Sequence, residues 1–227
     1  GSDGALYSLK IESNRATLAA GYTHNGSNFD FAVIRLTSSG ALDTTFFTAG
    51  AAITPIGSQT DIAYALIDYG DQSFFIIGEA NNGADMDFAI ARFNPDGTLA
   101  GSGTLDRAFG TNGIARFAGG TVVHSTLQTD GKLILGGETS LDTSGYIARV
   151  TTGGHLDTSF KASGLGFLNV GPTNDATVAS TVRTDGSFLV VGGAADVGAL
   201  AVYAYTIDGN LDTSFLTTGY RVELESI

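Results

Sequence analysis

The chain has 227 residues and no cysteine, and its 23 Asp and Glu against 11 Lys and Arg give a formal net charge of −12. The missing cysteines exclude disulfides and thiolate metal sites, and the acidity argues against binding to nucleic acid or anionic lipid, since both need basic side chains to neutralise phosphate. No apolar run is long enough to span a membrane, so we expect no direct insertion into one.

The 32 glycines are dispersed along the chain and accompany only 3 prolines. This pattern is typical of many short strands joined by tight turns. No segment carries a convincing helical period beyond one turn, so we predict an all-β fold.

A first repeat covers about residues 1–57. After a first strand, it contains two apolar strands at 16–21 (ATLAAG) and 31–36 (FAVIRL). The segment GALDTTF at 40–46 follows, and a last strand at 51–56 (AAITPI) ends the repeat. We call the pattern Gly-x-Leu-Asp-x-x-Phe the LD phrase.

The same order of elements recurs three times, in repeats at about 58–118, 119–171 and 172–227. In the second repeat the elements lie at 61–67, 74–78, 88–93, 103–109 (GTLDRAF) and 113–117. In the third they lie at 132–137, 146–150, 154–160 (GHLDTSF) and 166–170. In the fourth they lie at 178–182, 188–193, 200–206, 209–215 (GNLDTSF) and 220–226.

Each repeat thus predicts about four antiparallel strands, and periods of roughly 40–50 residues with four strands apiece are typical of propeller blades. We therefore predict a single β-propeller domain over 1–227, built from four blades. If each blade takes its last strand from the preceding repeat, the C-terminal strand at Tyr220–Glu225 would pair with the first repeat and close the ring. The alternative is that the four repeats are a piece of a larger ring or array in a larger surface protein.

The repeats resemble delta-60 repeats, a bacterial propeller-type repeat. The resemblance is clearest in FAIARFNPDG (88–97) followed by LDRAFGTNG (105–113), and it extends over the whole chain. It implies a repeat that occurs in large secreted or surface-attached bacterial proteins and has no established catalytic residues. We accordingly expect a location outside the cell or on the surface of a bacterium.

The acidic residue of the LD phrase invites a catalytic or metal-binding interpretation, but a structural one is stronger. An Asp followed by small residues favours a turn in which its carboxylate accepts backbone N–H groups. In three repeats an arginine could pair with it, whereas the fourth repeat has Ala204 at that position and keeps its Asp. We therefore assign a turn-building role to all four: Asp43, Asp106, Asp157 and Asp212.

The loops between the second and third strands differ among the repeats while the surrounding frame recurs. Loops on a rigid scaffold are where binding residues usually lie. We expect ligand binding by polar, acidic and aromatic residues of these loops, namely Tyr22, Asn25, Asn28, Phe29, Glu79, Asn81, Asn82, Asp85, Asp87, Glu138 and Asp142. We expect no cofactor, although the free carboxylates leave calcium binding open.

These observations favour a noncatalytic binding or adhesion module that meets a protein or glycan on a cell surface. No histidine pair has metal-ligand spacing, and no nucleophile motif precedes a helix, so we expect no enzyme activity. Two alternatives stay open: a hydrolase or lyase that uses carboxylates in a central channel, and a purely structural spacer.

Overall fold

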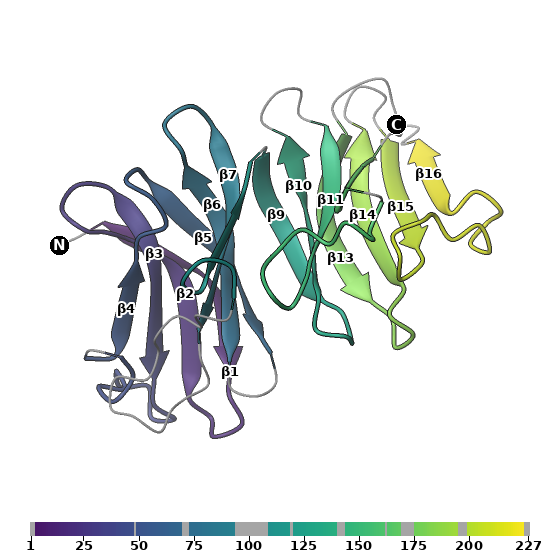
Figure 1. Cartoon of the computed structure of the whole chain (residues 1–227). Helices are drawn as coiled ribbons and strands as arrows, with labels where there is room; N and C mark the ends of the chain where they lie inside the picture. The colour runs from purple at the N-terminus through teal and green to yellow at the C-terminus, as the bar shows by residue number, and fades with distance from the viewer. Residues whose placement is uncertain are drawn as a thin grey trace. The chain divides into compact units, whose positions relative to one another are not determined.

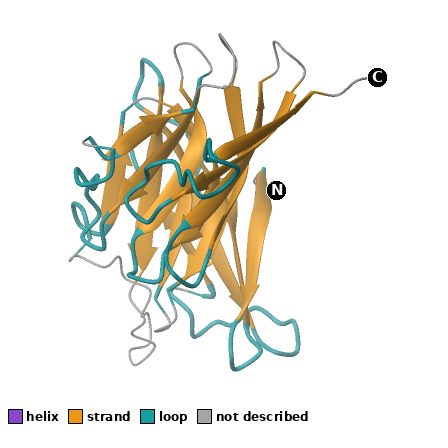
Figure 2. Cartoon of the chain, turned by 90° about the vertical axis from the view of Figure 1, so that its right-hand side faces the viewer, coloured by secondary structure: helices purple, strands orange, loops and turns teal. Residues whose placement is uncertain are grey.

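The computed structural model describes residues 3–47, 49–69, 73–93, 109–118, 120–139, 144–161, 163–168, 175–194 and 199–224. Within these ranges the chain folds into strands and loops and contains no helix (Figure 2). The described residues therefore hold no helix long and apolar enough to cross a membrane. The prediction of an all-β fold is confirmed.

Every repeat forms one four-stranded antiparallel sheet (Figure 1). Sheet 1 consists of β1 (Gly4–Ile11), β2 (Thr17–His24), β3 (Phe29–Leu36) and β4 (Ala51–Thr54). Sheet 2 consists of β5 (Asp61–Asp68), β6 (Phe74–Asn81), β7 (Met86–Phe93) and β8 (Ile114–Phe117). Sheet 3 consists of β9 (Gly120–Leu127), β10 (Leu133–Thr139), β11 (Gly145–Val150) and β12 (Leu165–Phe167). Sheet 4 consists of β13 (Asp175–Val182), β14 (Phe188–Ala194), β15 (Ala199–Tyr205) and β16 (Tyr220–Leu224).

The strands of each sheet lie in chain order, so the last strand of a repeat pairs with the third strand of that same repeat. The C-terminal strand β16 pairs with β15 of sheet 4, with Leu200 opposite Glu223 and Tyr203 opposite Tyr220. The prediction that this strand completes the first repeat is wrong. The reason lies in the LD phrase, which turns the chain back along the strand it has just left.

The Asp of the LD phrase and the glycine four residues after its Phe are both hydrogen-bonded to one residue near the end of the third strand. In the first repeat the Asp43 N–H donates to the carbonyl of Arg35 at 2.8 Å, and the Arg35 N–H donates to the carbonyl of Gly50 at 3.1 Å. The same pair of bonds joins Asp157 and Gly164 to Arg149. In the fourth repeat it joins Asp212 and Gly219 to Ala204, so the backbone bonds form without an arginine.

The carboxylate of the phrase holds the turn from inside. Asp43 Oδ1 accepts the backbone N–H of Thr45 at 3.0 Å and its hydroxyl at 2.6 Å. Asp157 and Asp212 make the same two contacts with the serine two residues on. Asp106 lies outside the described residues.

The chain forms two compact units, Gly1–Ala118 with sheets 1 and 2, and Gly119–Ile227 with sheets 3 and 4. The boundary coincides with that between the second and third repeats. In both units the first strand of the second sheet packs across the face of the first sheet: β5 contacts β1, β2 and β3, and β13 contacts β9, β10 and β11.

A glycine in each second strand permits a close backbone approach to the first strand. A Cβ on Gly78 would lie 2.0 Å from the carbonyl oxygen of Ile62, and one on Gly137 would lie 1.8 Å from that of Thr121. The pairing of first and second strands skips one residue beside each such glycine, which is a β-bulge. The glycines that end the apolar runs in the sequence therefore mark these contacts.

Candidate functional site

The loop between β2 and β3 is built around Asn25. Its side-chain oxygen accepts the N–H groups of Ser27 at 2.8 Å and Asn28 at 3.1 Å. Its amide nitrogen donates to Asn28 Oδ1 at 2.7 Å and to Asp30 Oδ2 at 2.6 Å. The side chains of Asn25 and Asn28 thus shape the loop, and Asn25 is exposed while Asn28 is half-buried.

The loop between β6 and β7 repeats this arrangement with Asn82 at its centre. Asn82 Oδ1 accepts the N–H groups of Ala84 at 2.8 Å and Asp85 at 3.0 Å. Its amide donates to the carboxylates of Asp85 and Asp87, and Asp87 also accepts a bond from Arg116 Nε at 2.7 Å. Two neighbouring repeats therefore present rigid loops of the same construction.

The remaining predicted binding residues are placed less uniformly. Asn81 Oδ1 accepts the N–H of Gly83 at 2.7 Å, at the start of the second loop. Glu138 lies half-buried near the end of β10, opposite Gly145. Asp142 lies outside the described residues.

A chain of five aromatic rings lies beside the first of these loops in the unit Gly1–Ala118. Tyr7 is 5.6 Å from Tyr64 and 5.8 Å from Tyr22, measured between ring centroids. Tyr22 is 5.0 Å from Phe29, which is 5.2 Å from His24. We call these five residues the aromatic cluster. It joins sheet 1 to sheet 2, and Tyr7 is 55% exposed.

A buried carboxylate adjoins the cluster on the side of sheet 2. The Tyr64 hydroxyl donates to Glu79 Oε1 at 2.6 Å, and Glu79 is only 8% exposed. Burial and this bond to a carboxylate raise the pKa of Tyr64 well above its usual range. A hydrogen bond with Tyr7 likewise raises the pKa of Tyr22. The phenols of Tyr22 and Tyr64 are therefore neutral donors and acceptors over the physiological range.

Sequence reasoning found Tyr22, Phe29 and Glu79 but missed Tyr7 and Tyr64. Both of these occupy the bulged position of a first strand, the residue that the pairing with the second strand skips. The equivalent residues are Val123 and Val178 in the other two sheets. The signal was a tyrosine at one repeat position in two repeats, which only an alignment over the bulge would have shown.

Two buried carboxylates support the loop ends without forming a metal site. Asp61 Oδ2 accepts the N–H groups of Ile56 at 2.8 Å and Gly57 at 3.1 Å. Burial raises the pKa of Asp61, and the negative charge of nearby Asp30 raises it further. The two hydrogen bonds act in the opposite direction but are outweighed. Within the described part of the chain, no three or more His, Cys, Asp or Glu residues come together so as to hold a metal ion.

The other titratable group of note is His124, which is 9% exposed. Its Nδ1 lies 2.9 Å from Ser180 Oγ, so its partner is a serine of sheet 4 rather than the adjacent Ser125. Burial lowers the pKa of His124 to about 4. This neutral histidine contributes to the packing of sheet 3 on sheet 4.

The chain is similar to several solved structures. The exo-β-1,3-galactanase 1,3Gal43A from Clostridium thermocellum has a TM-score of 0.52 at 12% identity, over 95% of this chain and 47% of the galactanase chain. A protein from Lactobacillus plantarum has a TM-score of 0.40 at 12% identity, over 91% of this chain and 69% of its own. Sqt1 from Chaetomium thermophilum has a TM-score of 0.34 at 9% identity, over 92% and 72%.

The chain thus spans less than half of the galactanase, and the likeness at 12% identity concerns the fold alone. A comparison with curated proteins finds no match. Residues 15–46, 75–99 and 128–160 match the family model described as a domain of unknown function (DUF5122) beta-propeller. Each matched segment covers the second and third strands of a repeat, apart from Phe74 at the start of β6. The first three repeats of this chain are thus β-propeller repeats that match the DUF5122 family.

Proposed function

We propose that the chain is a noncatalytic binding module of a bacterial secreted or surface protein. In this proposal its repeats are of the delta-60 type, and the ligand meets the aromatic cluster and the two Asn-centred loops beside it. The observation that carries the proposal is the run of five rings next to polar loops, in which the exposed Tyr7 lies between Tyr64 and Tyr22.

The chemistry of the cluster favours a glycan. Aromatic rings offer an apolar face on which a sugar ring can stack, and the phenols of Tyr7 and Tyr22 offer donors and acceptors for its hydroxyl groups. The side chains of Asn25 and Asn28 add amide groups at the edge of the same surface. The net charge of −12 disfavours a polyanionic ligand, so we expect a neutral or cationic one.

A glycan array followed by titration calorimetry tests the proposal. We expect wild-type protein to bind a subset of neutral glycans, and Tyr7→Ala and Tyr22→Ala each to weaken binding at least tenfold. Tyr220→Ala is the matched control, because Tyr220 is an exposed tyrosine of sheet 4, and it should bind as wild type does. Equal binding by all four proteins would refute a role for the cluster.

Two other outcomes are informative. Binding to cells that survives removal of their glycans, but not Tyr7→Ala, would identify a protein ligand at the same surface. Absence of binding to glycans and to cells alike would favour a structural spacer. Each variant must unfold at the same temperature as the wild type. We expect this of changes at exposed positions such as Tyr7.

A further inference from the structure

Neighbouring sheets within a compact unit pack by the same two faces. In Gly1–Ala118, sheet 1 presents Leu18, Ala20, Phe31 and Val33 to a face of sheet 2 that carries Phe74, Ile76, Ala89, Ala91 and Phe93. We call the first kind the outgoing face and the second kind the incoming face. Side chains alternate along a strand, so each sheet has one face of each kind.

In the unit Gly119–Ile227, sheets 3 and 4 pack through the same two kinds of face at equivalent strand positions. We call the contact between an outgoing and an incoming face a joint. The outgoing face of sheet 3 presents Ile134 and Ile147, and the incoming face of sheet 4 carries Phe188, Val190, Ala201, Tyr203 and Tyr205. The phenylalanine of the LD phrase fills each joint. Phe46 stacks on Phe74 at 6.2 Å, and Phe160 stacks on Phe188 at 6.1 Å.

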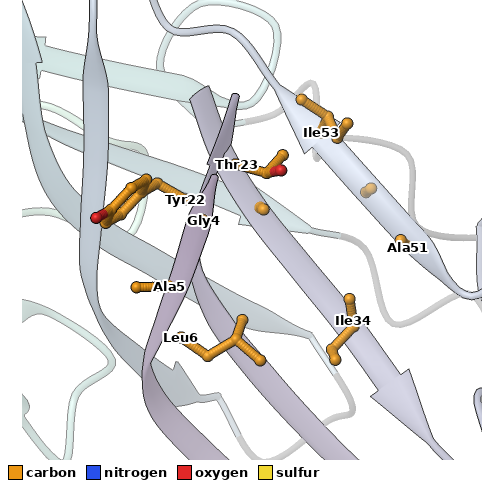
Figure 3. A pocket seen from close by; sticks show the side chains of 10 residues that line it. Gly4, Ala5, Leu6, Tyr22, Thr23, Ile34, Ala51 and Ile53 are labelled. Atoms are coloured by element: carbon orange, nitrogen blue, oxygen red, sulfur yellow. The ribbon is translucent and has the colours of Figure 1, made fainter. Parts of the chain in front are cut away.

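The incoming face of sheet 1 is exposed. Leu9, Ile11 and Ile53 lie on it and are 69%, 62% and 53% exposed. Together with Leu6 and Ile34, Ile53 lines a hollow of about 480 Å³. Figure 3 shows Tyr22, on the other face, pointing away from Ile34 and Ile53.

The outgoing face of sheet 4 is exposed as well. Leu200 is 59% exposed, whereas Phe88 at the equivalent position of sheet 2 is 1% exposed. Val191 is 37% exposed, whereas its equivalent Ile77 is fully buried. Phe215 of the last LD phrase is half-buried, although the phenylalanines of the other three phrases are almost fully buried.

We propose that the outgoing face of sheet 4 binds the incoming face of sheet 1 of a second copy of this chain, head to tail. The contact between the two sheets of each compact unit already pairs these two kinds of face, so the second copy continues an interface that the sequence encodes. Exposed apolar surface of this kind marks an interaction site. Because the two faces differ, the contact is heterologous and forms rings or open arrays.

Light scattering after size exclusion, over a range of concentrations, provides the first test. We expect the wild-type protein to exceed the 23.2 kDa of one chain as its concentration rises. Leu200→Lys on the outgoing face and Ile53→Lys on the incoming face should each weaken association at least tenfold. Phe167→Lys changes a 64% exposed apolar residue of sheet 3, which is neither of the two sheets proposed to associate, and should associate as wild type does.

Mixing the two face variants provides the decisive test. Leu200→Lys keeps an intact incoming face and Ile53→Lys keeps an intact outgoing face, so an equimolar mixture should form a dimer that contains one of each. Wild-type protein that stays at the mass of one chain at every concentration would overturn the proposal. Failure of the mixture to dimerise, when the wild type does, would also overturn it. Unaltered thermal unfolding of both variants excludes misfolding as the cause.

Discussion

The fourth repeat lacks the arginine of the third strand. It therefore serves as an internal control for how much the Arg–Asp pair adds to the stability of an LD phrase. In the third repeat, Arg149 Nε donates to Asp157 Oδ2 at 2.8 Å, and the Arg149 side chain is 2% exposed. In the fourth repeat, the cation nearest Asp212 is Arg183 at 3.8 Å, with its side chain 38% exposed. We compare Asp157→Ala with Asp212→Ala.

The expected magnitudes follow from these contacts. Removing Asp157 leaves the buried guanidinium of Arg149 without its carboxylate, and breaking a buried ion pair in this way costs about 3–5 kcal/mol. Removing Asp212 takes away the hydrogen bonds from Ser214, a loss of about 1 kcal/mol, because an exposed pair at 3.8 Å adds little. The first variant should therefore lose several times more stability.

The free energy of unfolding in urea, measured for both variants and the wild type, checks this expectation. The pH dependence adds a second check. Burial opposes ionisation of Asp157, but the bonds from Ser159 and Lys132 and the charge of Arg149 outweigh it and lower its pKa to about 2. This carboxylate therefore stabilises the fold fully above its unfolded value of 3.8, and the contribution is lost as the pH falls through 2. Equal losses for the two variants at neutral pH would refute the reasoning, because the turn alone would then explain both.

Three further changes are expected to have measurable effects. Gly78→Ala should destabilise the protein by about 1–3 kcal/mol in urea unfolding, because its Cβ would lie 2.0 Å from the Ile62 carbonyl oxygen. Protonation of His124 should lower the free energy of unfolding by about 3 kcal/mol as the pH falls from 6.5 to 4, because burial lowers its pKa to about 4, and His124→Gln should remove this part of the pH dependence. Phe160→Ala should cost about 3–5 kcal/mol and half-buried Phe215→Ala clearly less; equal thermal shifts for the two would contradict their different packing.

The fold was largely predictable because its signals are local and repeated. Apolar runs ending in glycine located the second strands, and the LD phrase located the turn that follows the third. The partner of the last strand was not predictable in this way. It depends on the backbone bonds that Ala204 makes with Asp212 and Gly219, and the sequence does not reveal in which direction such a turn returns the chain.

The candidate site was only partly predictable, because it combines segments that are distant in sequence. Tyr22 and Phe29 stand out within one repeat, although the structure places them at the end of β2 and the start of β3 rather than in the loop. Tyr7 and Tyr64 reach the same cluster because a bulge shifts the alternation of their strands, and no pattern of period two predicts that. The contact of His124 with Ser180 spans 56 residues and joins two sheets, so no spacing rule could indicate it.

The most direct test compares how ligand binding responds to a change in the aromatic cluster and to a change in an LD phrase. Calorimetric titration of a glycan selected on the array should give at least tenfold weaker binding to Tyr7→Ala than to wild type. Asp212→Ala, which alters only an LD phrase, should bind as wild type does. A result in which Tyr7→Ala binds normally and Asp212→Ala does not would contradict the claim that the phrase builds the scaffold and that the cluster beside the variable loops holds the ligand.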